Sequence, residues 1–414
     1  MEEKRKKTPW SSSVGKVHCS GDARVASFLR EAFAIPGFSF GSSPMSLQKE
    51  REKLGMHLFH SYSARTNPLV VRKLLSQGQK GDVVLDPFVG SGTTLVEALI
   101  AGKQGVGCDL SELAVRLTRL KTYPLDKKKQ NLLLQTGQQL LESSKEAIAK
   151  KVKPPRRYDD SSHYEPHVYL ELCNLRHQIE LLHKENAPAW LIECLLLIFS
   201  SILNKALKET PSSEEMRPRT LSKGRVSTWF FSRVEEMVVL EQWLCAKVPP
   251  GYILPEVFVH DARQPFSFMG TNGPCVDVII TSPPYLGVYD YAFQQARRQA
   301  FLGIDAKRFF EGEMGAKRFL TSSTERQQLI THQKDTNNWL KESAKWLRPG
   351  GFAYVVVGDS ILEQVHPGQM PIIQAAPAAG LEFVASCSIE KSGRRDFMDE
   401  PPTSEHLLAF IKKP

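Results

Sequence analysis

Two short segments of this 414-residue chain hold residues whose types and spacing suit ligand binding. The first, DPFVGSGTT at residues 86–94, contains Gly90 and Gly92, which allow a tight turn and close approach of a ligand to the backbone. The helix start that follows suits an anionic or carboxylate group. Asp109 lies 23 residues beyond Asp86, where an acidic side chain can bind ribose hydroxyls. Taken alone, the turn could be a simple connection and Asp109 a helix N-cap.

The second segment, TSPPY at residues 281–285, follows the apolar run 276–280. Pro283 and Pro284 stiffen the backbone and remove amide donors, which leaves carbonyl groups free to accept hydrogen bonds. A hydroxyl at Ser282 and an aromatic ring at Tyr285 flank the two prolines. Such a loop could hold a planar ring and accept from its exocyclic amine. A proline-stiffened loop with Tyr285 in the core is the alternative when this segment is taken alone.

The elements around these segments predict an α/β fold. Strand 83–85, the glycine turn, helix 93–101 and strand 106–108 follow one another as in half of a Rossmann-like sheet. Further strands are predicted at residues 257–259, 276–280, 352–357, 383–385 and 406–410. Helical periodicities without strands fill the region between, so we expect an inserted, mainly helical domain over residues 111–250. Residues 1–50 read as an irregular, basic N-terminal arm.

The net charge indicates a class of partner, and the cysteine and histidine spacing indicates which metal sites and disulfides to expect. The net charge is +9, of which +5 falls in residues 111–250 and +4 in residues 1–60, so a polyanionic partner is expected. The seven cysteines are scattered without a CxxC pair, which argues against a zinc cage or a disulfide framework. His57, His60, His163 and His167 form no convincing metal set, and no metal is predicted.

Hydrophobicity argues against a membrane protein. The most apolar run, residues 189–203, is interrupted by Glu193 and is shorter than the ~20 residues of a membrane span, so we expect a buried helix there. The first ten residues carry charges without an apolar segment behind them, so no secretory signal is expected. We therefore expect a cytoplasmic protein.

Together, DPFVGSGTT and TSPPY resemble the motifs of the amino-group DNA methyltransferases, which use S-adenosylmethionine to methylate an exocyclic base nitrogen. The segments HSYSARTNPLVVR (60–72), VFVHDARQPF (257–266) and LRPGGFAYVVVGDS (347–360) are similar to further segments of that family. The resemblance covers about residues 55–110 and 255–414, and residues 51–110 and 251–414 would form the catalytic domain. It implies a class I methyltransferase sheet of seven strands, the last antiparallel.

The resemblance also implies roles for individual residues. The implied cofactor-binding residues are Asp86, Phe88, Gly90, Ser91, Gly92, Thr93, Asp109 and Asp261, with Asp261 facing the adenine. Ser282 and the Pro283 carbonyl would accept from the amino group of a base flipped out of the duplex, with Pro284 stiffening the loop and Tyr285 stacking on the ring. The insert would recognise the DNA sequence. A cognate restriction endonuclease is a candidate partner.

The serine in TSPPY favours the N4 of cytosine, because SPPY loops in the family go mostly with cytosine and DPPY or NPPY loops with adenine. The N6 of adenine is the first alternative. RNA guanine-N2 methylation is a second, although those enzymes usually carry NPPY or DPPY and an RNA-binding domain before the catalytic core. A non-catalytic DNA-binding relative is a third. Cys275 stands before a strand, so we expect a buried residue rather than a nucleophile.

Overall fold

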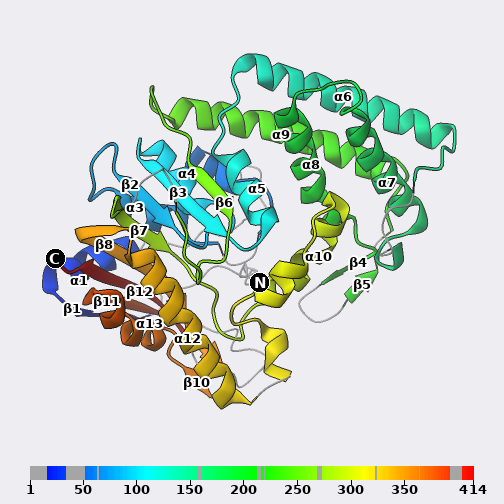
Figure 1. The fold of residues 1–414 in the computed structure, drawn as a ribbon. Helices are drawn as coiled ribbons and strands as arrows, with labels where there is room; N and C mark the ends of the chain where they lie inside the picture. Colours follow the sequence, from blue (N-terminus) through cyan, green and yellow to red (C-terminus); the bar gives the residue numbers. More distant parts are fainter. Residues whose placement is uncertain are drawn as a thin grey trace, which may run out of the picture.

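The structure is a computed structural model that describes residues 16–33, 52–62, 65–155, 161–211, 216–218, 220–267, 273–321, 324–362, 364–391 and 403–414. Its central element is a sheet with the strand order β1-β11-β12-β8-β7-β2-β3-β6 (Figure 1). The strands are β1 (Val17–Gly21), β2 (Val83–Asp86), β3 (Gln104–Asp109), β6 (Glu256–Val259), β7 (Val276–Thr281), β8 (Leu347–Gly358), β11 (Leu381–Lys391) and β12 (Thr403–Lys412).

Strand directions confirm the predicted Rossmann-like sheet. β6, β3, β2, β7 and β8 are parallel, and β12 is antiparallel to both β8 and β11. All seven predicted strands are present, and the last of them, β12, is antiparallel as expected. The carboxyl ends of β2, β3, β6 and β7 therefore meet at one edge of the sheet, which is where ligands bind in open α/β folds.

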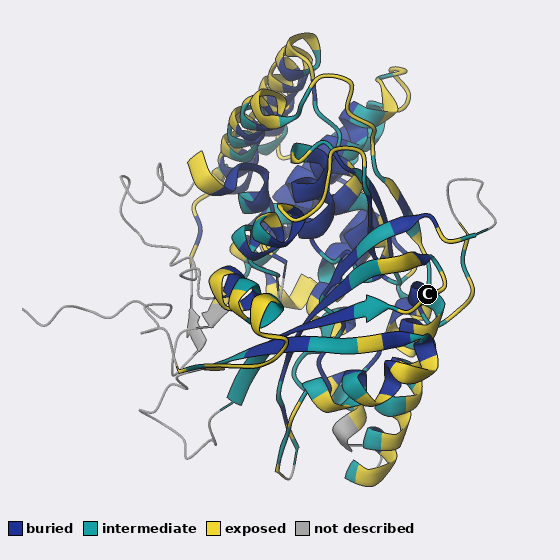
Figure 2. Cartoon of the chain, turned by 90° about the vertical axis from the view of Figure 1, so that its left-hand side faces the viewer, coloured by how far each residue is buried: buried dark blue, intermediate teal, exposed yellow. Residues whose placement is uncertain are grey.

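Helices cover both faces of this sheet, because its strands are apolar on both sides. Val83 and Leu85 pack toward α12 (Glu325–Ala344) and α13 (Gln369–Ala375), whereas Val84 between them packs toward α1 (Ala23–Phe33) and α3 (Pro68–Leu75). This alternation follows the two-residue period of a strand. Figure 2 shows buried residues along the strands and exposed residues on the outer faces of the helices.

The prediction of an irregular N-terminal arm is wrong for residues 17–33. β1 pairs antiparallel with β11 and adds an eighth strand to the sheet, and α1 packs against β11 with Leu29 and Ala32 fully buried. β1 is mostly exposed, so its sequence shows no apolar alternation, and its position depends on backbone pairing with a strand more than 350 residues away. The remainder of the predicted arm lies outside the described residues.

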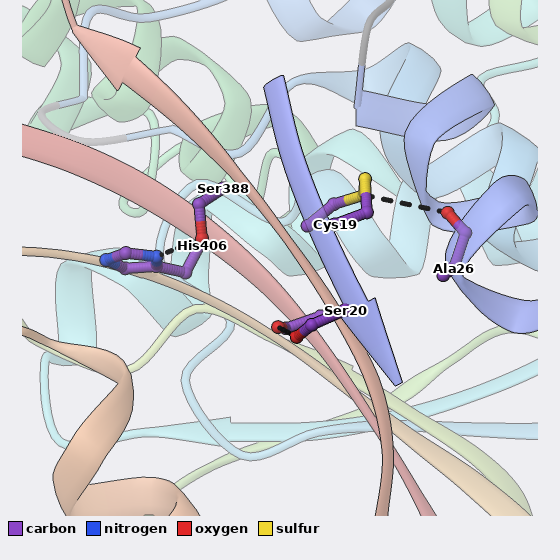
Figure 3. Close-up of a disulfide and its surroundings, with 7 residues drawn as sticks. Cys19, Ser20, Ala26, Ser388 and His406 are labelled. Atoms are coloured by element: carbon purple, nitrogen blue, oxygen red, sulfur yellow. Dashed lines mark hydrogen bonds between the residues drawn. A yellow bond between two sulfur atoms is a disulfide. The ribbon is translucent and has the colours of Figure 1, made fainter. Parts of the chain in front are cut away.

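One disulfide joins this added strand to the sheet, contrary to the expectation from cysteine spacing. Cys19 and Cys387 are opposite each other in the β1–β11 register, with their Cα atoms 4.1 Å apart (Figure 3). The other five cysteines form no disulfide within the described residues. A separation of 368 residues gives no local sequence signal, so the pairing follows only from the strand register.

A helical layer lies beside the sheet and corresponds to most of the predicted insert (Figure 1). It contains α6 (Lys127–Ala149), α7 (Pro166–Leu181), α8 (Ala189–Leu203) and α9 (Arg225–Lys247), with the short strands β4 (Glu209–Pro211) and β5 (Met216–Pro218). The stretch Ala189–Ala206 is apolar enough and long enough for a membrane span, but 67% of it is buried inside the protein. α8 is thus the core helix of this layer.

The helical layer shares a core with the sheet domain, so its boundaries differ from those predicted. α5 (Glu112–Lys121), which we assigned to the insert, packs against β3 and β6. Conversely, α10 (Tyr291–Leu302) of the catalytic segment packs on α8, and Phe301 contacts Phe199. Residues of α4 (Thr93–Ile100) and the 3-10 helix η1 (Gly55–Leu58) belong to the same apolar cluster.

The remaining elements are short. They are α11 (Lys307–Gly312), β9 (Ser360–Ile361), β10 (Val365–His366) and the 3-10 helices η2 (Ser161–His163), η3 (Asn204–Ala206), η4 (Lys317–Thr321) and η5 (Pro377–Ala379). Of these, α11 adjoins the candidate site described next.

Candidate active site

A cavity opens at the carboxyl edge of the parallel strands. The residues from the sequence analysis that line it are Asp86, Phe88, Gly90, Ser91, Thr93, Asp109, Asp261, Ser282 and Pro284. The fold therefore joins the two segments singled out in the sequence, although they lie nearly 190 residues apart. Three predicted site residues, Gly92, Pro283 and Tyr285, are not part of the lining.

Backbone hydrogen bonds fix the glycine loop between β2 and α4. The amide of Val89 donates to the carbonyl of Cys108 on β3 at 3.0 Å. Gly90 has a φ of +50°, and a Cβ added there would have no atom closer than 3.8 Å. The loop thus presents its backbone to open space at Gly90, as a ligand-binding turn requires.

Gly92 has a different role from the one predicted. It is the N-cap residue of α4 with a φ of +82°, and an added Cβ would lie 2.8 Å from the Thr118 hydroxyl of α5. The absence of a side chain at Gly92 therefore allows α4 to pack against α5. Its contribution to the cavity is indirect, through the position of the helix start.

A buried lysine, Lys121, donates a hydrogen bond to the backbone of the glycine loop. Lys121 is 1% exposed, and its Nζ donates to the carbonyl of Ser91 at 2.9 Å. Burial lowers the pKa of Lys121 well below its ordinary value, and the positive charge of Arg65 lowers it further. Nothing in the local sequence marked this residue, because its role depends on how the end of α5 packs beneath the loop.

Asp109 ends β3 and faces the cavity from a half-buried position. Its carboxylate accepts from the amides of Gly90, at 2.9 Å, and Ser111, at 2.8 Å. Burial raises the pKa of Asp109 to about 6, although these two hydrogen bonds favour the charged form. The side chain thus both anchors the loop and offers acceptor capacity to a ligand.

Asp86 links the two motifs directly. Its carboxylate accepts from the Thr281 hydroxyl at 2.7 Å and from the amide of Phe88 at 3.1 Å. The side chain is 4% exposed, and burial raises its pKa to about 6. Because Thr281 directly precedes Ser282, this hydrogen bond holds the loop at residues 281–285 next to the glycine loop.

Asp261 lines the cavity after β6, but its carboxylate is already engaged. Arg263 donates to both of its oxygens, with Nε–Oδ1 and Nη2–Oδ2 distances of 2.9 and 2.8 Å. Burial acts to raise the pKa of Asp261, but the hydrogen bonds and charge of Arg263 hold it below the ordinary value. Arg263 also contacts Asp335 of α12 and the carbonyl of Gly312. Sequence reasoning missed Arg263, although it stands in the quoted segment.

The loop at residues 281–285 places Ser282 and Pro284 on the cavity wall. Both follow β7, which is paired with β2 and β8 in the centre of the sheet. The Ser282 hydroxyl lies 3.4 Å from the hydroxyl of Tyr285. Ser282 therefore provides a hydroxyl at the same edge as Asp86 and Asp109.

Tyr285 belongs to the core rather than to the cavity. It is 8% exposed, and its ring covers Gly358, where an added Cβ would lie 2.7 Å from the ring. Its hydroxyl donates to Glu405 at 3.2 Å, and burial raises its pKa well above the ordinary value. The arrangement is the core-packing alternative of the sequence analysis, not the predicted stacking surface.

Several lining residues had no assigned role in the sequence analysis. They are Tyr62, Arg65, Thr66, Pro87, Val89, Thr94, Leu110, His260, Ala262, Tyr291, Phe309, Gly312, Glu313 and Met314. The first three belong to the segment 60–72 that resembles a family motif. The last four follow no recognised pattern, because α11 and the turn after it reach the cavity only through tertiary packing.

The residues that line the cavity suit S-adenosylmethionine in charge and polarity. Its lining holds four carboxylates and one guanidinium, which suits a ligand with a sulfonium and an ammonium group. Phe88, Leu110, Phe309 and Met314 add apolar surface of the kind that an adenine ring requires. Within the described residues, no group of three or more His, Cys, Asp or Glu side chains is placed to hold a metal ion.

Comparisons with known proteins agree with this site. A family described as DNA methylase matches residues 44–119, which include the glycine loop and Asp109. The chain is 22% identical over 357 residues to the Type II methyltransferase M.BsoBI of Geobacillus stearothermophilus, covering 79% of this chain and 67% of that enzyme. It is 36% identical over 89 residues to M.MjaII of Methanocaldococcus jannaschii, covering 21% of this chain and 17% of that enzyme.

Solved structures resemble the chain only distantly. TrmN from Thermus thermophilus has a TM-score of 0.33 and 12% identity, over 95% of this chain and 81% of that one. The rRNA methyltransferase aviRa from Streptomyces viridochromogenes has a TM-score of 0.33 and 11% identity, over 85% and 88%. The fold is therefore identified by the strand order and directions given above.

Proposed function

Because the chain belongs to the amino-group DNA methyltransferases, which use S-adenosylmethionine, we propose that it methylates the exocyclic N4 of a cytosine flipped out of duplex DNA. The observation that carries the proposal is Ser282. Its hydroxyl stands on the cavity wall at the end of β7, in the serine form of the loop that goes mostly with cytosine. The amino nitrogen of a paired base is buried in the helical stack, so the base must leave the duplex to react.

The chain contributes position and hydrogen-bond acceptors. The Ser282 hydroxyl and the Pro283 carbonyl would accept from the amino group and orient its nitrogen lone pair. The Thr281–Asp86 bond would hold this loop at a fixed distance from the glycine loop. S-adenosylmethionine supplies the activated methyl group when it is bound. Transfer is then a direct displacement, for which positioning provides much of the acceleration and no covalent nucleophile is required.

The expected product is N4-methylcytosine in DNA. DNA from cells that make the protein, digested to nucleosides and separated by mass spectrometry, should contain N4-methyl-2′-deoxycytidine that is missing in cells with an empty vector. N6-methyl-2′-deoxyadenosine without N4-methyl-2′-deoxycytidine would overturn the cytosine assignment and leave an amino-group methyltransferase of adenine. Methylated guanosine found only in RNA would show that the substrate is RNA rather than DNA.

We propose further that the helical layer, within residues 111–250, recognises the DNA sequence. Support comes from charge and position. Residues 111–250 carry +5 of the total +9, of which +3 belongs to residues 122–250 of the layer itself, and the layer lies beside the sheet (Figure 1). Phosphate contacts by these cations should make DNA binding fall steeply with salt.

Exchange of residues 122–250 for the matching segment of M.BsoBI should move methylation to another sequence, as read by sequencing of the modified DNA. Because the layer shares an apolar core with α4 and α10, thermal unfolding of the chimera serves as the control for folding. A folded chimera that keeps the original sequence would assign recognition to residues 251–414 instead.

A further inference from the structure

Arg263 joins two residues of the cavity wall to a helix behind it. Its guanidinium donates to both oxygens of Asp261, from Nε to Oδ1 at 2.9 Å and from Nη2 to Oδ2 at 2.8 Å. The same Nη2 donates to the carbonyl of Gly312, the last residue of α11, at 2.7 Å, and Nη1 donates to Asp335 of α12 at 3.1 Å. Asp261 and Gly312 line the cavity, whereas Arg263 does not. The guanidinium therefore fixes two wall residues from outside the cavity.

Arg263 also uses most of the hydrogen-bonding capacity of Asp261. The Oδ1 atom accepts from the Nε of Arg263 and, at 3.0 Å, from its backbone amide. Among the described residues, the Oδ2 atom accepts only from Nη2 of Arg263. A carboxylate oxygen has two lone pairs, so Oδ1 is fully used and Oδ2 keeps one acceptor position. Asp261 can thus accept one further hydrogen bond, from a ligand that offers a donor.

The wall next to Asp261 is apolar. Ala262 follows Asp261 directly, lines the cavity and belongs to the same apolar cluster as Met314, another lining residue. A Cβ added at Gly312 would lie 2.9 Å from the side chain of Leu110, so α11 closely approaches the loop after β3. An apolar wall with one free acceptor suits a purine ring that carries an exocyclic amino group. Of the parts of S-adenosylmethionine, only the adenine has this chemistry.

We propose that Arg263 is a positioning residue that makes the site selective for the amino group of the cofactor's adenine. By holding both oxygens of Asp261, it orients the carboxylate so that Oδ2 accepts from that amino group. By holding the carbonyl of Gly312, it keeps α11 beside the ring. A guanidinium makes this two-point contact in a fixed geometry, whereas an ammonium is a single point charge. The proposal requires cofactor binding alone, so it holds whichever base the enzyme methylates.

The test measures how strongly the site distinguishes two ligands that differ at this amino group. S-adenosylhomocysteine is the cofactor without its transferable methyl group, and S-inosylhomocysteine has an oxygen in place of the adenine amino group. Titration calorimetry of the full chain, without DNA, gives both dissociation constants. The wild-type protein should bind S-adenosylhomocysteine about tenfold or more tightly than the inosyl ligand, because an oxygen that faces Oδ2 offers no donor.

Arg263→Lys should lower this preference to about threefold or less, because lysine keeps the positive charge but loses the two-point contact. It should also raise the KM for S-adenosylmethionine, whereas the rate of methyl transfer at saturating cofactor should stay close to that of the wild type. Asp261→Asn should lower the preference as well, because the amide has only one oxygen to accept a hydrogen bond.

Arg116→Lys is the matched control. Arg116 of α5 makes the same two-point pair with Glu193 of α8, with both distances 2.7 Å, and does not line the cavity. Its side chain is 16% exposed, against 17% for Arg263. This variant should leave the ligand preference unchanged. Because the preference is a ratio of two dissociation constants, an unfolded fraction of the sample does not alter it.

Three results would overturn the assignment of Arg263. They are equal affinity of the wild-type protein for the two ligands, a wild-type preference in Arg263→Lys, and the same loss of preference in Arg116→Lys. All three are measured without DNA, so they are distinct from a failure of the cytosine assignment, which the analysis of nucleosides tests. A wild-type protein that binds neither ligand would contradict the cofactor assignment and this proposal together.

Discussion

Replacement of Ser282 by alanine should lower the rate of methyl transfer about a hundredfold or more, while the affinity for S-adenosylmethionine stays the same. The amino nitrogen gains positive charge as it forms the new bond, so an acceptor in fixed position stabilises the transition state more than the ground state. Ser282 lines the cavity, and its hydroxyl lies 3.4 Å from that of Tyr285. The alanine variant should therefore fold normally. Single-turnover methyl transfer and calorimetry of cofactor binding measure the two quantities.

Ser76→Ala is the matched control for this variant. Ser76 is an exposed serine at the end of α3, and its hydroxyl bonds only to the carbonyl of Lys73. It should leave the rate and the affinity unchanged. If Ser282→Ala methylates DNA at the wild-type rate, Ser282 has no catalytic role, and the inference of cytosine from this residue is lost as well.

Replacement of Asp109 by asparagine should weaken binding of S-adenosylmethionine by roughly tenfold to a hundredfold. Hydrogen bonds to a charged group contribute about 1.5–3 kcal/mol. Asparagine is neutral, so the ribose hydroxyls would no longer donate to a charged carboxylate. Calorimetry measures the change. Asp126→Asn is the matched control, because Asp126 is an exposed helix N-cap on α6, far from the cavity lining, and asparagine caps as well as aspartate.

The pKa of Asp109 also predicts how the affinity for S-adenosylmethionine depends on pH. The pKa of Asp109 is raised to about 6, and so is that of Asp86. Each carboxylate is therefore charged above pH 6 and gains a proton as the pH falls below it. The affinity should be highest above pH 6 and fall below it, by up to about tenfold per pH unit for each carboxylate that must be charged.

In Asp109→Asn this dependence should become shallower, because only Asp86 still titrates in this range. Wild-type affinity that stays constant from pH 7.5 to 5 would show that neither carboxylate needs its charge to bind the cofactor. An unchanged affinity in the variant would remove Asp109 from the binding site, whatever the pH dependence of the wild type.

Some positions in the motifs have roles that their sequence does not reveal. Gly92 is a packing glycine against Thr118, and Tyr285 is a core residue under Gly358. In both cases the residue type fits either role. The choice depends on a neighbour from a distant part of the chain. For the same reason the Cys19–Cys387 disulfide and the edge strand β1 could not be foreseen.

The sequence by itself determined the positions along the chain of the seven main strands, the two loops that follow strands β2 and β7, and the residues Asp86, Asp109 and Ser282. These follow from local patterns: short apolar strands, glycines that need unusual backbone angles, and prolines that stiffen a turn. Because parallel strands end at one edge of the sheet, the loops that follow them had to meet.

Only the tertiary structure decided what surrounds those residues. Arg263 reaches Asp261 because the loop after β6 folds back, and Lys121 reaches the glycine loop because α5 packs beneath it. Glu313, Arg318 and the rings of Phe310 and Phe319 come together through α11, η4 and the turn between them, none of which carries a motif. Side-chain packing and buried ion pairs join residues that are distant in sequence, so no local pattern records them.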